Sequence, residues 1–398
     1  MNFLLVGCGM MGARHARGLA ELERTVPGTV RLTALCDRRP EFAAKLADEC
    51  QELFGERPAI FPDIETAVAA QPDLQAADLV TDPRSHDDLA VALMSAGLHV
   101  MCEKPLALTI ARGQRMIEAA ERTGKVLATA ENNRHDPMNR LAQACLHAGL
   151  IGEPNFMLQL VINPANSIIG TAWRHRLAMG GALLDVGLHA AYGIECLMGP
   201  ITTVYAQARQ VQQARSGTEY DGTQVAVEVD SEDCLTATLN FASGATGQLS
   251  MHFASPGETM GKRLIIGSEG TMDPAGDRSG RPPTIRRGND TITGADLLPL
   301  VPDFRLNEIE TRLWGERPSG FEIPYPETDR KLIASEMHGF ISAIETGSRL
   351  EADAATGLRS VAIIEAMLES SMAGRPVTAD ETMSGSLHTY QDRLERAQ

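Results

Sequence analysis

The sequence predicts an α/β fold in its first third and an α+β fold in the remainder. Residues 1–130 alternate short apolar runs with amphipathic stretches of helical period, which is typical of a parallel sheet with crossover helices. After residue 130, strand-like runs follow one another too closely for intervening helices, which favours a large, mostly antiparallel open sheet. Because 398 residues exceed one ordinary core, we expect two domains, 1–130 and 131–398.

The first domain is predicted to hold a doubly wound parallel sheet. Its strands are the apolar runs at 3–6, 30–36, 59–61, 76–81, 98–102 and 125–130. Helices are predicted over 10–24, 40–53, 86–96 and from Thr109 onward. Pro40 suits a first helical turn, Gly97 ends a helix, and Thr109 stands in an N-cap position. Arg112 and Arg115 are expected on the outer face of the last helix.

The second domain is predicted to combine five strands with three long helices. The strands are expected at 154–162, 202–211, 234–241, 245–253 and 263–266, and the helices at 181–198, 330–345 and 354–373. Ser243 and Gly244 form a hairpin turn between two of the strands. Residues 273–327 are rich in Pro, Gly, Arg and Asp with weak periodicity, so they are either a long functional loop or an insertion.

Composition narrows the possible partners and the compartment. A net charge of −16 disfavours binding to nucleic acid or to anionic membrane surfaces. Seven cysteines occur singly, which indicates reduced thiols in a cytoplasm. The N-terminus reads as a strand and not as a signal peptide, and no apolar run approaches the ~18 residues of a membrane span. We therefore expect a cytoplasmic protein without nucleic-acid or membrane partners, and no metal site is predicted.

A glycine-rich turn follows the first strand and opens the first helix. The run GCGMMG at residues 7–12 permits a tight turn and a close approach of pyrophosphate to backbone N–H groups at a helix N-terminus. This context predicts a Rossmann domain that binds a dinucleotide. The residues expected to contact it at the turn are Gly7, Gly9, Met10, Met11 and Gly12.

Asp37, at the end of the second strand, is placed to hydrogen-bond the ribose hydroxyls of the adenosine. Its carboxylate would repel a 2′-phosphate, which favours NAD. Arg38 and Arg39 follow directly, and guanidinium groups recognise phosphate well, so NADP stays possible. Asp37 and Arg38 are both predicted to contact the cofactor.

Three further residues suggest a reactive centre. Lys104 lies just past the fifth strand in the run 103–105, where the carboxyl ends of parallel strands border a ligand crevice. Asp185 and His189 are four residues apart on an apolar helix and so project from one face. A lone lysine is more often a surface charge, and an Asp–His pair can be a core hydrogen bond. Beside the crevice, however, a histidine that titrates near neutrality suits the proton transfer of alcohol chemistry.

These motifs, in this order, resemble the Gfo/Idh/MocA family, which includes glucose-fructose oxidoreductase and inositol dehydrogenases. The resemblance rests on GxGxxG at 7–12, AGLHVxxEKP at 96–105, Asn133-Arg134 followed by Pro137, and GGxxxDxGxH at 180–189. Residues 353–358 and 374–377 also resemble the family ending, so the likeness covers nearly the whole chain.

The resemblance implies reversible oxidation of a secondary hydroxyl on a sugar or cyclitol by NAD, with NADP possible. It also implies a homodimer or homotetramer built through the open sheet. Lys104 would polarise the substrate oxygen, Asp185 would orient the substrate, and His189 would be the general acid/base. Glu103 and Lys104 would also border the cofactor.

Two runs depart from the family pattern. The run at 81–86 has a displaced proline and lacks an asparagine, which weakens the expected cofactor contacts there; Thr81 and His86 are its predicted cofactor residues. Tyr192 replaces an acid that many relatives carry three residues after the histidine, and it would stack on a sugar or merely pack. Trp173 and Arg174, just upstream of the catalytic helix, are candidate substrate contacts or a loop anchor.

Two alternatives stay open within the family. One is a non-catalytic regulator that senses a dinucleotide. The other is a glycosidase that uses tightly held NAD as a transient redox device. Joint retention of Lys104, Asp185 and His189 argues against the regulator, and the acidic charge argues against direct DNA contact.

Overall fold

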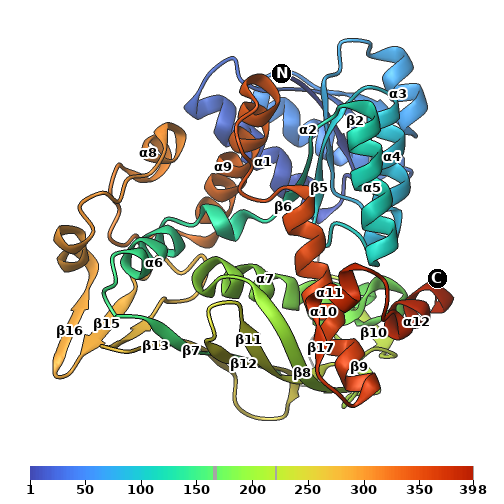
Figure 1. Cartoon of the computed structure of the whole chain (residues 1–398). Helices are drawn as coiled ribbons and strands as arrows, with labels where there is room; N and C mark the ends of the chain where they lie inside the picture. The colour runs from blue at the N-terminus through green and yellow to red at the C-terminus, as the bar shows by residue number, and fades with distance from the viewer. Residues whose placement is uncertain (165–167, 220–221, 398) are drawn as a thin grey trace.

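The computed structural model describes residues 1–164, 168–219 and 222–397 and contains two large sheets (Figure 1). The first is six-stranded, in the order β3-β2-β1-β4-β5-β6, and all its pairs are parallel. This is the doubly wound topology predicted for the first domain. Its strands are β1 Asn2–Val6, β2 Arg31–Cys36, β3 Ala59–Phe61, β4 Ala76–Leu79, β5 His99–Glu103 and β6 Leu127–Ala130.

The helices of this domain begin close to the predicted positions, and one of them was not predicted. They are α1 Met10–Thr25, α2 Pro40–Phe54, α3 Ile64–Ala70, α4 His86–Ser95 and α5 Ile110–Thr123. The short helix α3 escaped prediction because its seven residues carry too little periodicity.

Thr109 occupies the N-cap position of α5, but its side chain makes no capping bond. Its hydroxyl donates instead to Glu395 at 3.0 Å, and the Gln391 side chain accepts the first helical N–H, that of Ile110, at 2.9 Å. Both partners lie on α12, Thr389–Ala397. The C-terminal helix thus caps α5, and Arg112, which was predicted on the outer face, pairs with Glu395 of that helix.

The second sheet has nine strands in the order β16-β15-β14-β13-β7-β12-β11-β8-β17. Its pairs are antiparallel except β7 with β12, so the prediction of a mostly antiparallel sheet is confirmed. Gly244, with φ of 88°, makes the predicted hairpin turn. The strands are β7 Pro154–Pro164, β8 Ile201–Arg209, β11 Cys234–Phe241, β12 Thr246–Ser255, β13 Met260–Gly267, β14 Thr271–Asp273, β15 Thr284–Arg287, β16 Asp290–Thr293 and β17 Val377–Thr378.

Two long helices, α7 Gly181–Met198 and α10 Ala354–Ala373, cover one face of this sheet. Burial alternates along β11, so the opposite face is open. In Figure 1, α10 runs between the two sheets and contacts both. Short elements complete this half: η2 Asn132–His135, α6 Pro137–His147, η3 Ala172–His175, η4 Leu177–Met179, a separate hairpin β9 Ala214–Thr218 with β10 Gln224–Glu228, and α11 Ala379–Met383.

One segment contradicts the expectation that no apolar run reaches the length of a membrane span. By length and composition alone, Leu177–Met198 is long and apolar enough to cross a membrane. In the structure 72% of its apolar window is buried inside the protein, because the helix is packed between the sheet and α10. The segment is therefore a core helix of the second domain.

Residues 273–327 add strands to the second sheet and then return to the first domain. After β14, β15 and β16 come η5 Gly294–Leu300, α8 Glu308–Trp314 and α9 Tyr325–Thr346, which begins five residues earlier than predicted. Helix α9 lies against α1, and Ile333 and Phe340 join the core beneath β1 (Figure 1). The domains 1–130 and 131–398 stay a prediction, and α9 of the second packs against α1 of the first.

Candidate active site

Glycines are required at two positions of the turn after β1. A Cβ on Gly7, whose φ is 100°, would lie 2.6 Å from the Val80 oxygen, and a Cβ on Gly12 would lie 2.1 Å from the Gly7 oxygen. A Cβ on Gly9 would meet no protein atom within 4 Å. Gly9 therefore faces open space at the N-terminus of α1, where a phosphate group can approach the backbone.

Asp37 is fixed beside this turn. Its Oδ2 accepts the Cys8 N–H at 2.7 Å and its Oδ1 accepts the Arg39 N–H at 2.8 Å. The carboxylate therefore stands where β1 and β2 end side by side, as predicted for a group that binds ribose hydroxyls. Arg38 is exposed directly after it, while the Arg39 guanidinium stacks on the Phe42 ring at 3.7 Å.

His86 does not present a nitrogen to a ligand. Its fully buried ring places Nδ1 2.8 Å from the Pro105 carbonyl and Nε2 3.2 Å from the Thr81 carbonyl. It therefore ties the loop after β4 to the loop after β5. The prediction that its side chain contacts the cofactor is wrong, whereas Thr81 remains half-buried at the edge of the crevice.

Glu103, the last residue of β5, pairs with a buried histidine. Its side chain is 11% exposed, as is that of Lys104. Glu103 lies 3.6 Å from His15 Nε2, and the other ring nitrogen of His15 is 2.9 Å from Asp78. Burial acts to raise the pKa of Glu103, but the His15 hydrogen bond and the Lys104 charge lower it to about 2. Glu103 is thus an ion-pair residue, and its contact with the cofactor stays a prediction.

Lys104, Asp185 and Arg174 form the charged centre of the site. Lys104 Nζ donates to Asp185 Oδ1 at 2.8 Å, and Arg174 Nε donates to Asp185 Oδ2 at 2.8 Å. Burial acts to raise the pKa of Asp185, but the Lys104 and Arg174 charges overcome it and hold this pKa well below its ordinary value. Arg174, which was predicted as a substrate contact, therefore also fixes the ionised Asp185 from η3.

His189 is held by a residue that the sequence did not reveal. Its Nδ1 lies 2.8 Å from Glu131 Oε2 and 3.3 Å from Asn133 Nδ2. Glu131 directly follows β6, at the same carboxyl edge of the sheet that positions Lys104. That location was the available signal, since polar residues after parallel strands converge there. The side chain of His189 is 28% exposed, so one edge of the ring is open.

Tyr192 and Trp173 differ in their fit to a substrate role. Tyr192 is only 2% exposed and packs in the core with the Arg134 guanidinium 5.4 Å from its ring, so a stacking contact with a sugar is ruled out at this position. Trp173 is half-buried, and Arg174 lies 4.5 Å over its ring. Trp173 thus supports the arginine that holds Asp185 and keeps a partly open face.

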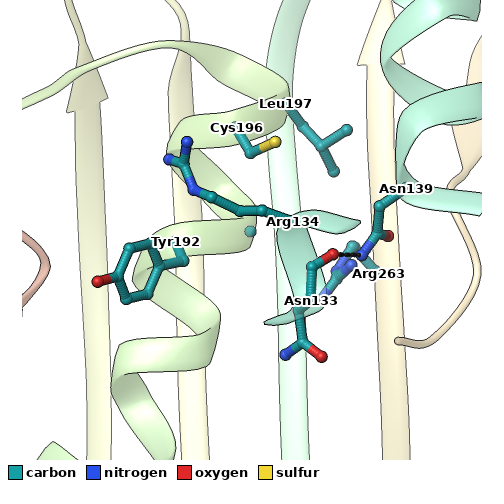
Figure 2. A pocket seen from close by; sticks show the side chains of 8 residues that line it. Asn133, Arg134, Asn139, Tyr192, Cys196, Leu197 and Arg263 are labelled. Atoms are coloured by element: carbon teal, nitrogen blue, oxygen red, sulfur yellow. Dashed lines mark hydrogen bonds between the residues drawn. The ribbon is translucent and has the colours of Figure 1, made fainter. Parts of the chain in front are cut away.

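A network behind the site fixes the segment that carries Glu131. Figure 2 shows Asn139 of α6 hydrogen-bonded to the Asn133 carbonyl, at 2.9 Å, in a small pocket between η2 and α7. The same amide reaches Asp277 at 2.9 Å, and Asp277 pairs with Arg263 at 3.0 Å. Asp277 lies within the 273–327 region, which therefore supports the site.

The Asp277–Arg278 turn also contacts the segment that follows β6. Arg278, with φ of 58°, donates its side chain to Asn132 and its backbone N–H to Asp136 at 2.7 Å. Its guanidinium also contacts the Tyr325 hydroxyl at 3.2 Å. Over the described residues, no group of three or more His, Cys, Asp and Glu side chains is arranged to hold a metal ion.

The glycine turn, the carboxylate at the end of β2, and the Lys–Asp–His set at the carboxyl edge of a doubly wound sheet define a dinucleotide-dependent oxidoreductase. Family models agree over both halves of the chain: an oxidoreductase family with an NAD-binding Rossmann fold matches residues 1–131, and the C-terminal α/β domain of the same family matches residues 145–379. The chain belongs to the Gfo/Idh/MocA oxidoreductase family.

Individual relatives are similar over almost their full length. D-apiose dehydrogenase of Paraburkholderia graminis is 25% identical, covering 94% of this chain and 88% of the relative. Levoglucosan dehydrogenase of Pseudarthrobacter phenanthrenivorans is 26% identical, covering 93% and 96%. A solved levoglucosan dehydrogenase in complex with NADH and L-sorbose is 25% identical with a TM-score of 0.76, covering 96% of this chain and all of that one.

Proposed function

We propose that the protein oxidises a secondary hydroxyl of a sugar or cyclitol, or reduces the corresponding ketone, with NAD as the hydride carrier. The observation that supports this most is the Lys104–Asp185 pair at 2.8 Å beside the open edge of His189. A cation, a fixed carboxylate and a titratable imidazole are the groups that alcohol–ketone chemistry requires.

The residues present fit a bound dinucleotide. Gly9 leaves space at the α1 N-terminus, and Asp37 lies beside the turn to accept ribose hydroxyls. When bound there, NAD supplies the hydride acceptor at its nicotinamide ring. Asp37 disfavours a 2′-phosphate, so we propose NAD as the preferred cofactor and NADP as the poorer one.

The protein side chains would handle the proton and the developing charge. Lys104 stabilises negative charge on the substrate oxygen, because an ammonium that donates to the Asp185 carbonyl and carboxylate keeps a third N–H for the substrate. Asp185, kept ionised, accepts from a substrate hydroxyl and orients the ring. His189 takes the hydroxyl proton in oxidation and returns it in reduction.

Two alternative functions make different demands on this site. A regulator needs no proton-handling centre, so the set of Lys104, Asp185 and His189 would have no role in it. A glycosidase that recycles NAD uses the same groups, so the structure leaves it as the second candidate. Net formation of NADH separates the two.

The assembly and the compartment are also proposals. We propose a homodimer or homotetramer joined through the open sheet face, supported by exposed Tyr205 on β8 and half-buried Leu160 and Leu264 there. A cytoplasmic location is supported by seven free cysteines. Light scattering tests the oligomeric state, and a monomer at micromolar concentration would contradict the proposed dimer or tetramer.

The activity is tested by NADH absorbance with a panel of sugars, anhydrosugars and inositols. A dehydrogenase reduces added NAD with one class of these. Release of sugar from a glycoside without net NADH would favour the glycosidase, and cofactor binding without either reaction would favour the regulator.

A further inference from the structure

Glu131 is a buried acid whose only described strong contacts are with its own turn and with the proposed base. Its Oε1 accepts the Asn133 N–H at 3.2 Å, and its Oε2 is 2.8 Å from His189 Nδ1. The side chain is fully buried, whereas His189 keeps an open edge. We propose that Glu131 is the positioning residue of His189, an inference that rests on the proposed dehydrogenase function.

The geometry determines which nitrogen reacts. Nδ1 lies closer to the Glu131 carboxylate, at 2.8 Å, than to Asn133 Nδ2, at 3.3 Å. A carboxylate accepts hydrogen bonds and does not donate them, so Nδ1 carries the proton of the neutral ring. Nε2 is then the nitrogen with a free lone pair, on a side chain that is 28% exposed. Glu131 therefore selects one tautomer and one ring orientation, as partners of reactive histidines do.

Other acids face His189, but they are neutralised by cations. Asp185, on the same helix, is engaged by Lys104 and Arg174. Asp277, from the turn after β14, is engaged by Arg263. Glu131, from the carboxyl end of β6, is the acid that is hydrogen-bonded to the ring itself.

This contact couples the acid to the chemical step. In oxidation the alcohol proton passes to Nε2, the hydride and its electron pair pass to NAD, and the carbon–oxygen double bond forms. The ring becomes a cation beside the buried Glu131 carboxylate, which stabilises it. In reduction the same proton returns to the alkoxide oxygen and the charge on the ring is lost.

Glu131→Gln tests the role while preserving shape. The amide can hydrogen-bond either tautomer and carries no charge, so we expect kcat to fall ~10²–10⁴-fold with KM changed less than about threefold. For alcohol oxidation, the acid limb of the kcat/KM profile should move to lower pH, because the imidazolium loses its counter-charge. A merely structural acid would change stability without moving that limb.

Glu310→Gln is the matched control. Glu310 of α8 is fully buried and lies 3.0 Å from His135 Nδ1 of η2. This is a second Glu–His pair close to Glu131 in the sequence, and neither of its residues takes part in the proposed chemistry. Its loss should lower the melting temperature and leave the pH profile unchanged. Glu131→Asp should restore part of kcat and the original position of the acid limb.

A direct readout does not depend on turnover. In the NAD-bound wild-type protein, ¹⁵N NMR should show His189 protonated at Nδ1 and bare at Nε2, and Glu131→Gln should give a mixture. Wild-type kcat and an unmoved acid limb in Glu131→Gln, or the opposite tautomer in the wild type, would overturn the proposal. If the wild type oxidises no sugar or cyclitol, the proposed function fails instead, and the NMR result still decides the role of Glu131.

Discussion

At the scale of single residues, Asp185 connects the charges of the site. Lys104 and Arg174 approach its two oxygens from different elements, β5 and η3, and both distances are 2.8 Å. Buried ion pairs of this kind contribute little net stability, because desolvation offsets the attraction. These ion pairs instead hold a cation and an anion in place beside His189.

Replacing Lys104 with Met should remove the charge and keep the apolar stem. We expect kcat/KM to fall ~10²–10⁴-fold, because the developing negative charge on the substrate oxygen loses its cation. NADH binding, followed by fluorescence, should change little. Lys262→Met is the control, since Lys262 of β13 pairs with Asp273 of β14 away from the site. Equal rates in the wild type and Lys104→Met would contradict the assignment.

Asp37 should control the choice between the two cofactors. Asp37→Ser removes the charge that repels a 2′-phosphate, so the ratio of kcat/KM for NAD over NADP should fall ~10-fold or more. Arg38→Ala should move the ratio the other way. Steady-state kinetics with both cofactors measure it, and a wild-type preference for NADP would contradict this role of Asp37.

The site was predictable where chemistry follows a local motif. The glycines, Lys104, Asp185 and His189 each stand in a recognisable run and lie where that run predicts. Glu131 was not predictable in the same way, because its partner is 58 positions further along the chain. His86 was misassigned because a motif does not show whether a side chain faces the crevice or the core.

At the scale of elements, strands were found where they are apolar and missed where they are polar. The six runs of the first sheet are continuous and apolar, so each was recognised. Strand β9, with the sequence ARSGT, has no apolar alternation, and its hairpin with β10 was not predicted. The start of α9 was missed since Tyr325 and Pro326 follow a Pro-rich stretch, although proline suits a first helical turn.

The packing of α1 on α9 depends on a glycine. A Cβ on Gly18 would lie 2.2 Å from Cγ2 of Ile333, so Gly18→Ala should destabilise the fold by ~1–3 kcal/mol despite the better helix propensity of alanine. Gly339→Ala, on α9, is the control: its nearest atom is 3.7 Å away, so it should be neutral or stabilising.

Denaturant unfolding of these variants checks the contact. Ile333→Ala should rescue part of the loss in Gly18→Ala, which gives a double-mutant cycle with a favourable coupling energy. Additive effects of the two substitutions would show that the helices do not meet at this point.

Helix α10 carries a buried acid whose protonation should affect stability. Burial, followed by the nearby Glu369 and Glu395 charges, raises the pKa of Glu365 well above its ordinary value. Because the pKa of Glu365 is higher in the folded than in the unfolded protein, its contribution to the free energy of unfolding is present at low pH and is lost as the pH rises. Glu365→Gln should therefore melt above the wild type at about pH 8.5, and the gap should narrow towards about pH 5.

Glu381 should show the opposite dependence of stability on pH. The Arg375 hydrogen bond and the Thr378 backbone lower its pKa to about 2. Its contribution is present above the unfolded pKa and is lost as the pH falls, so Glu381→Gln should lose its effect in acid. If the melting temperature of Glu365→Gln followed the same pH trend as that of Glu381→Gln, this would contradict the assignment of Glu365 as a buried acid that is neutral in the folded protein.

At the scale of the whole molecule, the site is assembled from both halves of the chain. The turns after β5 and β6 supply Lys104 and Glu131, while α7 supplies Asp185 and His189. The chain then returns to the first domain through α8 and α9, and α10 contacts both sheets (Figure 1). The sequence predicted the two sheets but not this return, because the packing of α9 on α1 joins residues more than 300 positions apart.

The central claim is that a carbon-bound hydride passes from a sugar or cyclitol to NAD at this site. Deuterium transfer from perdeuterated sugars and inositols to added NAD, followed by mass spectrometry of the cofactor, tests it most directly. We predict that singly deuterated NADH accumulates with the wild type and not with Lys104→Met. Unlabelled cofactor throughout, or deuterium returned only to a cleaved sugar product without net NADH, would contradict a dehydrogenase.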